Sequence, residues 1–90
     1  MDNFYLYIIY STSINKYYVG HSNNLPERLK KHNSNHKGYT GKANDWVIVY
    51  SEIHNSKESA YRREREIKDW KSRILIEKLI KENSGSEHPD

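Results

Sequence analysis

The residues of this sequence best suited to chemistry lie in its first third. Arg28 and His32 are four residues apart, so a helix would place one above the other on the same face. Tyr7 and Tyr18 precede them in tyrosine-rich segments. A guanidinium can bind phosphate, and phenol and imidazole groups can transfer protons. A surface helix with ordinary basic residues is the plainer interpretation, and this stretch taken alone favours it.

A carboxylate further along the chain is the second chemical feature. Residues 56–70 have a helical pattern whose apolar stripe passes through Ala60 and Ile67. Glu64 lies on that stripe, and burying its carboxylate is costly unless a cation or a metal ion is close. Two other interpretations stay open. The side chain is exposed to solvent, or it forms an ion pair with one of Arg62, Arg63, Arg65 and Lys68.

Hydrophobic periodicity predicts the elements that must position these groups. Alternating apolar residues predict strands over residues 4–10, 17–21 and 46–52, the first two forming an antiparallel hairpin. In the third strand, Trp46, Ile48 and Tyr50 should share one face. Helices are expected over residues 25–33 and 56–70 and again after Ser72. Asn24 should cap the first helix, with a capping box closed by the residue three positions on, Glu27.

Composition limits the class of protein. The chain has 90 residues, a net charge of +3 and no cysteine, which excludes disulfides and thiolate metal sites. Its basic character suits an anionic partner such as nucleic acid, although charge also serves solubility. We expect one domain over residues 1–83, a disordered tail over 84–90 and a cytoplasmic location, since the sequence shows neither a signal peptide nor a membrane-spanning apolar run.

Taken together, these residues resemble a known superfamily. The set of Tyr7, the segment Tyr18-Val19-Gly20, Arg28, His32 and Glu64 is similar to that of GIY-YIG endonucleases. The resemblance is closest to small single-domain bacterial members, which are similar to the N-terminal nuclease domain of the bacterial excision-repair nuclease. It covers residues 4–80. Tyr5 and Leu6 stand where the family has Gly-Ile, a familiar variant among the small members.

The resemblance implies both a fold and an activity. The implied fold is a mixed α+β domain, a three-stranded antiparallel sheet flanked by helices. The implied activity is divalent-metal-dependent hydrolysis of DNA phosphodiester bonds. Glu64 would hold one Mg²⁺ or Mn²⁺, and Arg28 would bind phosphate. Either Tyr7 or Tyr18 would activate water, helped by cations or by His32, because an unperturbed tyrosine loses its proton only near pH 10.

Substrate contacts and other functions are less determined. We expect His21 to be an exposed loop residue. The residues expected to contact nucleic acid are Gly20, Lys31, Lys37, Tyr39 and Lys42. DNA, branched or single-stranded, is the expected partner, RNA is a second option, and a protein partner could direct the enzyme. Two other functions stay open: a nucleic-acid-binding or partner-binding module with little activity, and a dimer module that uses the apolar stripe of residues 74–80.

Overall fold

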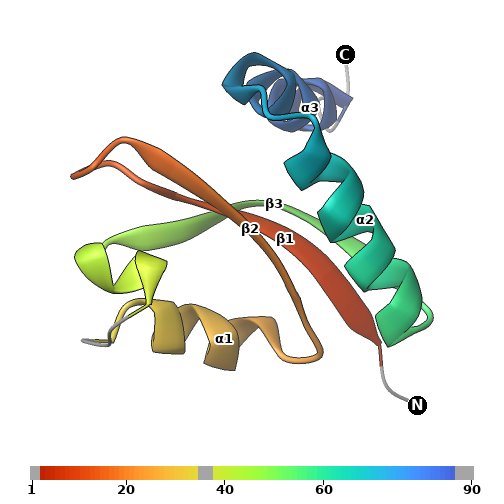
Figure 1. Cartoon of the computed structure of the whole chain (residues 1–90), viewed down its shortest axis with the longest axis horizontal. Helices are drawn as coiled ribbons and strands as arrows, with labels where there is room; N and C mark the ends of the chain where they lie inside the picture. Colours follow the sequence, from red (N-terminus) through yellow and green to blue (C-terminus); the bar gives the residue numbers. More distant parts are fainter. Residues whose placement is uncertain (1–2, 35–37, 87–90) are drawn as a thin grey trace.

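The computed structural model describes residues 3–34 and 38–86. It contains a three-stranded antiparallel sheet with strand order β2-β1-β3 and helices on both faces (Figure 1). This arrangement confirms the predicted α+β class. The strands are β1 (Phe4–Ser11), β2 (Lys16–Ser22) and β3 (Trp46–His54). The helices are α1 (Leu25–His32), the 3₁₀ helix η1 (Tyr39–Lys42), α2 (Lys57–Asp69) and α3 (Arg73–Ser86).

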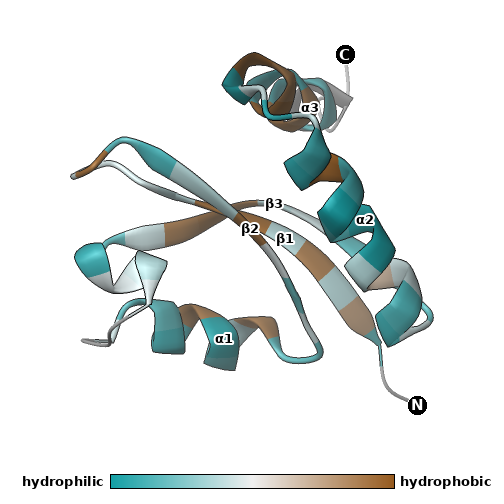
Figure 2. Cartoon of the chain, viewed as in Figure 1, coloured by the Kyte–Doolittle hydropathy of each residue, from teal (hydrophilic) through white to brown (hydrophobic). Residues whose placement is uncertain are grey.

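The central strand β1 is buried on both faces, which explains its nearly continuous apolar sequence. Leu6 and Ile8 point toward the layer formed by α2 and α3, whereas Tyr7 and Ile9 point toward α1. All four side chains are 3% exposed or less. Figure 2 shows the hydrophobic positions of α1 facing the sheet and its hydrophilic positions facing outward. The sheet therefore separates two small cores rather than covering one.

A bulge in β3 changes which residues share a face. Ile8 pairs with Tyr50 but Ile9 pairs with Ile48, so Val49 is an extra residue opposite β1. Tyr50 consequently packs in the core between the sheet and α2–α3, while Ile48 packs in the core beside α1. The sequence-based prediction that these two residues share a face was wrong, because simple alternation cannot anticipate an inserted residue.

Hydroxyl and amide side chains fix the helix ends. Asn24 Oδ1 accepts a hydrogen bond from Glu27 N at 3.1 Å, as predicted. The second half of the capping box is absent, because Asn24 N donates to Ser22 Oγ instead. Ser56 caps α2, and Ser72 accepts a bond from the first turn of α3.

The third helix is longer than its apolar stripe suggested. It continues to Ser86, into the segment 84–90 expected as a tail, and residues 87–90 lie outside the described part of the chain. No helix in the described part combines the length and apolar content needed to cross a bilayer.

Asn33 connects the end of α1 to the start of β3. Its Oδ1 accepts a hydrogen bond from Trp46 N at 2.7 Å, and its Nδ2 donates to Trp46 O at 3.1 Å. Trp46 in turn donates its indole N–H to Thr40 O at 2.8 Å. The buried Trp46 ring thus holds α1, η1 and β3 together on one side of the sheet.

We expect Asn33→Ala to lower the free energy of unfolding by about 1–3 kcal/mol, because it leaves backbone polar groups of Trp46 without their partners. Urea denaturation followed by tryptophan fluorescence would measure the change. Asn23→Ala, at an exposed position, is the matched control and should have little effect. Equal stability of the two variants would contradict the bridging role of Asn33.

Candidate active site

A buried chain of hydrogen bonds joins three of the elements. Tyr7 Oη lies 2.7 Å from His32 Nε2, and His32 Nδ1 lies 2.7 Å from Thr40 Oγ1. The three side chains are all less than a tenth exposed. Polar groups at such depth must be satisfied by one another, so this chain fixes the C-terminal end of α1 and η1 against β1.

The protonation of Tyr7 follows from its surroundings. Burial, chiefly, and the nearby Tyr18 phenol raise the pKa of Tyr7 above its usual value, although the positive charge of Arg28 acts in the opposite direction. Tyr7 therefore keeps its proton at neutral pH. Two proton arrangements satisfy the chain. In the one with a hydrogen on Nδ1, His32 donates to Thr40 and its Nε2 accepts from Tyr7, which is the arrangement needed to draw a proton from the phenol.

Gly20 gives Tyr7 its place. The two residues are directly opposite each other in the β1–β2 ladder. A Cβ atom at position 20 would lie 2.6 Å from Tyr7 Oη and 2.8 Å from its Cζ, closer than atoms can approach without movement. It would also lie 3.2 Å from Tyr18 Cε2. The absence of a side chain at Gly20 is thus what lets the two tyrosines lie side by side over the strand.

Tyr18 lies at the free edge of the sheet and is half-buried. Its ring centroid is 5.1 Å from that of His32 on one side. The Tyr39 ring stacks against it at 6.2 Å, and Lys68 Nζ lies 5.4 Å from its centroid. Tyr18 therefore connects the buried chain of hydrogen bonds to the surface and to α2.

Glu64 is 8% exposed, which confirms the carboxylate predicted on the core stripe of α2. Its Oε2 accepts a hydrogen bond from Lys68 Nζ at 2.6 Å, and its Oε1 lies 2.5 Å from His21 Nδ1. Of the cations considered from sequence, Lys68 is the one that pairs with it. The ion pair and the ring contact of Lys68 with Tyr18 bring α2 to the same edge of β2 as the tyrosines.

His21 is the residue that sequence reasoning misjudged. It is half-buried in β2 rather than exposed in a loop, because β2 continues to Ser22. Strand alternation could have found it: His21 shares a face with Val19, and that face packs on α2. The Tyr61 ring lies edge-on to the His21 ring at 5.6 Å, so His21 has contacts from α2 on more than one side.

Arg28 lies at the entrance to this cluster. It is exposed, in contrast to His32 one turn later, and its charge lowers the pKa of Tyr7. Together with Ser22, Asn24 and Lys31 it lines a shallow depression of about 320 Å³. An exposed guanidinium beside buried phenol and imidazole groups is suited to hold an anion against them.

The donor set around Glu64 limits the kind of metal site available. The described residues include no group of three or more His, Cys, Asp or Glu side chains able to hold a metal ion. A single carboxylate still fits Mg²⁺ or Mn²⁺, since a hydrated ion of this kind is often bound by one or two carboxylates together with substrate phosphates. Each oxygen of Glu64 already has a protein partner but keeps a second lone pair.

The residues expected to contact nucleic acid divide into three groups. Lys31 is exposed near Arg28, and Lys42 Nζ lies 5.3 Å from the centroid of the Tyr39 ring. Gly20 is buried beneath the tyrosines, where it has the packing role described above. Lys37 lies outside the described residues.

Gly20→Ala should lower the free energy of unfolding by about 1–3 kcal/mol, because Tyr7 must move to admit the methyl group. Adding Tyr7→Phe removes the closest atom and should recover part of the loss. A double-mutant cycle by urea denaturation measures this coupling. Strict additivity of the two substitutions would contradict the proposed contact.

The raised pKa of Tyr7 predicts a loss of stability in alkali. Above pH 10 the unfolded chain loses a phenol proton that the folded chain retains, so the free energy of unfolding falls, by up to about 1.4 kcal/mol per pH unit. Burial and a hydrogen bond to Glu52 also raise the pKa of Tyr50 to about 12, which adds to the fall. Denaturation at several values between pH 9 and pH 11.5 should show a shallower slope for Tyr7→Phe. Equal slopes would show that Tyr7 titrates normally.

Comparison with known proteins agrees with this geometry. The family model described as "GIY-YIG catalytic domain" matches residues 3–85. A UPF0213 protein of Staphylococcus haemolyticus is 39% identical over 84 residues, which cover 91% of this chain and 99% of the relative. A UPF0213 protein of Staphylococcus aureus is 32% identical over 83 residues, with the same coverage of both chains.

A solved structure shows the same likeness. The solution NMR structure of the UPF0213 protein BH0048 from Bacillus halodurans is similar with a TM-score of 0.56 and 32% identity. The similarity covers 88% of this chain and 83% of that one. The family match spans the sheet, α1, α2 and nearly all of α3, and therefore every residue of the cluster around Tyr18. The chain belongs to the GIY-YIG catalytic domain family, which indicates a nuclease-type function.

Proposed function

We propose that this protein is a divalent-metal-dependent endonuclease that hydrolyses phosphodiester bonds in DNA. The observation that carries the proposal is the 2.7 Å hydrogen bond from Tyr7 to His32, in a site that also holds Arg28 and the buried carboxylate of Glu64. A phenol, a base behind it, a phosphate-binding cation and a carboxylate are the groups that metal-assisted hydrolysis requires.

Arg28 positions the substrate. Its exposed guanidinium offers several N–H donors in a planar fork that matches two phosphate oxygens. A phosphate held there lies over the tyrosines and next to solvent, from which the attacking water comes. Binding at this point also brings negative charge toward Tyr7, whose pKa already responds to the charge of Arg28. Arg28 therefore compensates the charge of the scissile phosphate.

Tyr7 and His32 move the proton. Because its pKa is raised, Tyr7 acts as a relay and not as a free phenolate. The attacking water gives a proton to Tyr7 Oη as Tyr7 passes its own to His32 Nε2, and the water oxygen bonds to phosphorus as the bond to the leaving oxygen breaks. Thr40 keeps the imidazole in the required orientation through Nδ1. Tyr18 is closer to solvent and orients the water or the phosphate.

Glu64 would hold the metal ion. A bound Mg²⁺ or Mn²⁺ stabilises negative charge on the leaving oxygen or on the phosphate. His21 orients the carboxylate through Oε1, which leaves the Lys68 side as the direction of approach. With only one carboxylate supplied, the affinity for metal should be weak until a substrate phosphate completes the coordination.

A second function is favoured by one contact. The ammonium of Lys68 lies 2.6 Å from Glu64 Oε2 and already neutralises the carboxylate that would bind a metal. A binding module that retains the fold but cleaves slowly would need no more than this. The same contact is compatible with an enzyme if Lys68 moves aside, because its side chain is 43% exposed and has room to do so.

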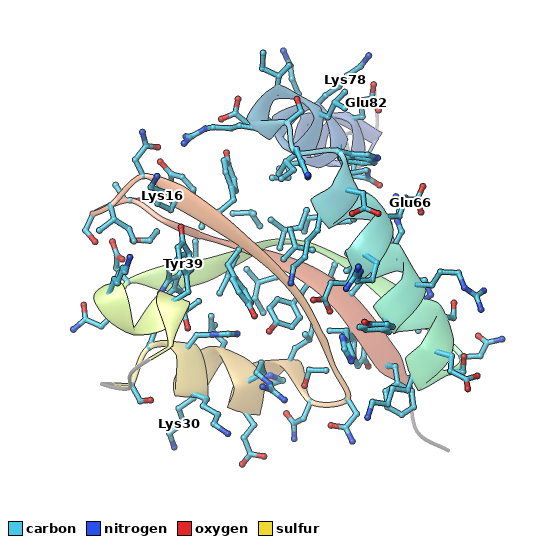
Figure 3. All side chains as sticks on the ribbon, in the orientation of Figure 1. Lys16, Lys30, Tyr39, Glu66, Lys78 and Glu82 are labelled. Carbon is cyan, nitrogen blue, oxygen red and sulfur yellow. The ribbon has the colours of Figure 1, made fainter. Side chains whose placement is uncertain are left out.

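The test is cleavage of linear, nicked, branched and single-stranded DNA with Mg²⁺ or Mn²⁺. Glu64→Gln and added chelator should abolish cleavage, and Tyr7→Phe should lower kcat about 10²–10⁴-fold. Glu66→Gln is the matched control. It removes one carboxylate from the same helix at a side chain that is 58% exposed and points away from the site (Figure 3).

The outcomes separate the two functions. Full activity of Glu66→Gln alongside inactive Glu64→Gln supports the nuclease. Salt-sensitive DNA binding without cleavage by the wild type supports the binding module. Cleavage unchanged by Glu64→Gln would mean that Glu64 is not the metal ligand or that the preparation contains another nuclease.

A further inference from the structure

A groove of about 480 Å³ lies along the free edge of β2, on the far side of Tyr18 from His32. It is bounded by β2, by η1 and by the corner between α2 and α3. Its polar and aromatic lining includes Lys16, Tyr17, Tyr18, Tyr39, Lys68 and Lys71. In Figure 3, Lys16 and Tyr39 lie on the same side of the molecule, whereas Lys30 and Lys78 project from other edges.

The lining of this groove is positively charged. Four of its residues are cations and none is an acid. Lys68 is paired with Glu64, and Arg73 with Glu77. Lys16 and Lys71 are exposed and form no ion pair with any other described residue, so their charges are available to an anionic ligand.

The backbone of Lys71 supports the same conclusion. Lys71 follows α2 with a φ of 49°, in the left-handed region that glycine or asparagine adopts at lower cost. A lysine in this position holds a long cationic side chain at a tightly fixed turn. Because Lys71 lines the groove, this unfavourable conformation places a positive charge beside it.

An aromatic ring is also available in the groove. Tyr39 is 44% exposed while its ring lies nearly parallel to that of Tyr18, at an interplanar angle of 23°. The exposed part of the ring is held in a fixed orientation by that stacking. Bases of single-stranded nucleic acid bind to such rings together with a cationic groove that follows the backbone.

We infer that this groove binds one unpaired strand of the nucleic acid substrate next to the scissile phosphate. Lys16 and Lys71 contact its phosphates, and one unstacked base lies against Tyr39. The inference rests on the proposed function, because Tyr18 forms the wall between the groove and the catalytic cluster. The volume is that of a pocket for a small ligand, which suits a nucleotide and not a double helix.

The test is binding without cleavage, measured by fluorescence anisotropy in EDTA with a labelled single-stranded oligonucleotide and the blunt duplex of the same sequence. The double variant Lys16→Gln/Lys71→Asn removes two charges, and asparagine tolerates the conformation at position 71. It should reduce the slope of log K against log salt by about 1.4 for the single strand. Lys30→Gln/Lys78→Gln removes the same net charge elsewhere and should change the slope by less than half as much.

Substitution of Tyr39 tests the stacking separately. Tyr39→Ala should weaken single-strand binding about tenfold, whereas Tyr39→Phe should retain it, and duplex binding should respond to neither. Single-strand affinity unchanged by Tyr39→Ala, or equal effects of the two lysine pairs, would overturn the inference even if the protein cleaves DNA. Groove-dependent binding without any cleavage would support the groove while the proposed nuclease function fails.

Discussion

The hydrogen bond between Tyr7 and His32 is the contact on which the rest of the site depends. A phenol this deeply buried needs a partner, and the partner comes from the last residue of α1. That requirement fixes α1 against the sheet, and the second ring nitrogen of His32 fixes Thr40 and hence η1. Gly20 makes the arrangement possible because it leaves room for the Tyr7 ring. Chemical function and local packing therefore depend on the same few atoms.

The free edge of β2 is where the two halves of the site meet. Tyr7 and Tyr18 belong to the layer between the sheet and α1, whereas His21 and Glu64 belong to the layer between the sheet and α2. In a wider sheet these groups would lie on opposite faces with a strand between them. Because β2 has a neighbour on one side only, Lys68 can reach around its edge from Glu64 to the Tyr18 ring.

Much of the fold and several site residues followed from the sequence, for identifiable reasons. Strand alternation and helical periodicity located the elements, and Glu64 was noticeable because a carboxylate on an apolar stripe contradicts its surroundings. The bulge at Val49 was not predictable, since it depends on how β3 pairs with β1. His21 was misplaced because its environment comes from α2, more than forty residues away. Local patterns report neighbours in sequence, and these features depend on neighbours in space.

The order of the strands has a consequence for folding. The β1–β2 hairpin joins residues close in sequence, such as Tyr10 and Tyr17, whereas β3 must return from position 46 to pair with β1. Local contacts form early and distant ones late. The two tyrosines can therefore be brought together by the hairpin, but Glu64 arrives only when α2 docks on the completed sheet. A chain that is still emerging from the ribosome, or one that has lost α2, lacks the carboxylate, so any hydrolytic capacity belongs to the finished fold alone.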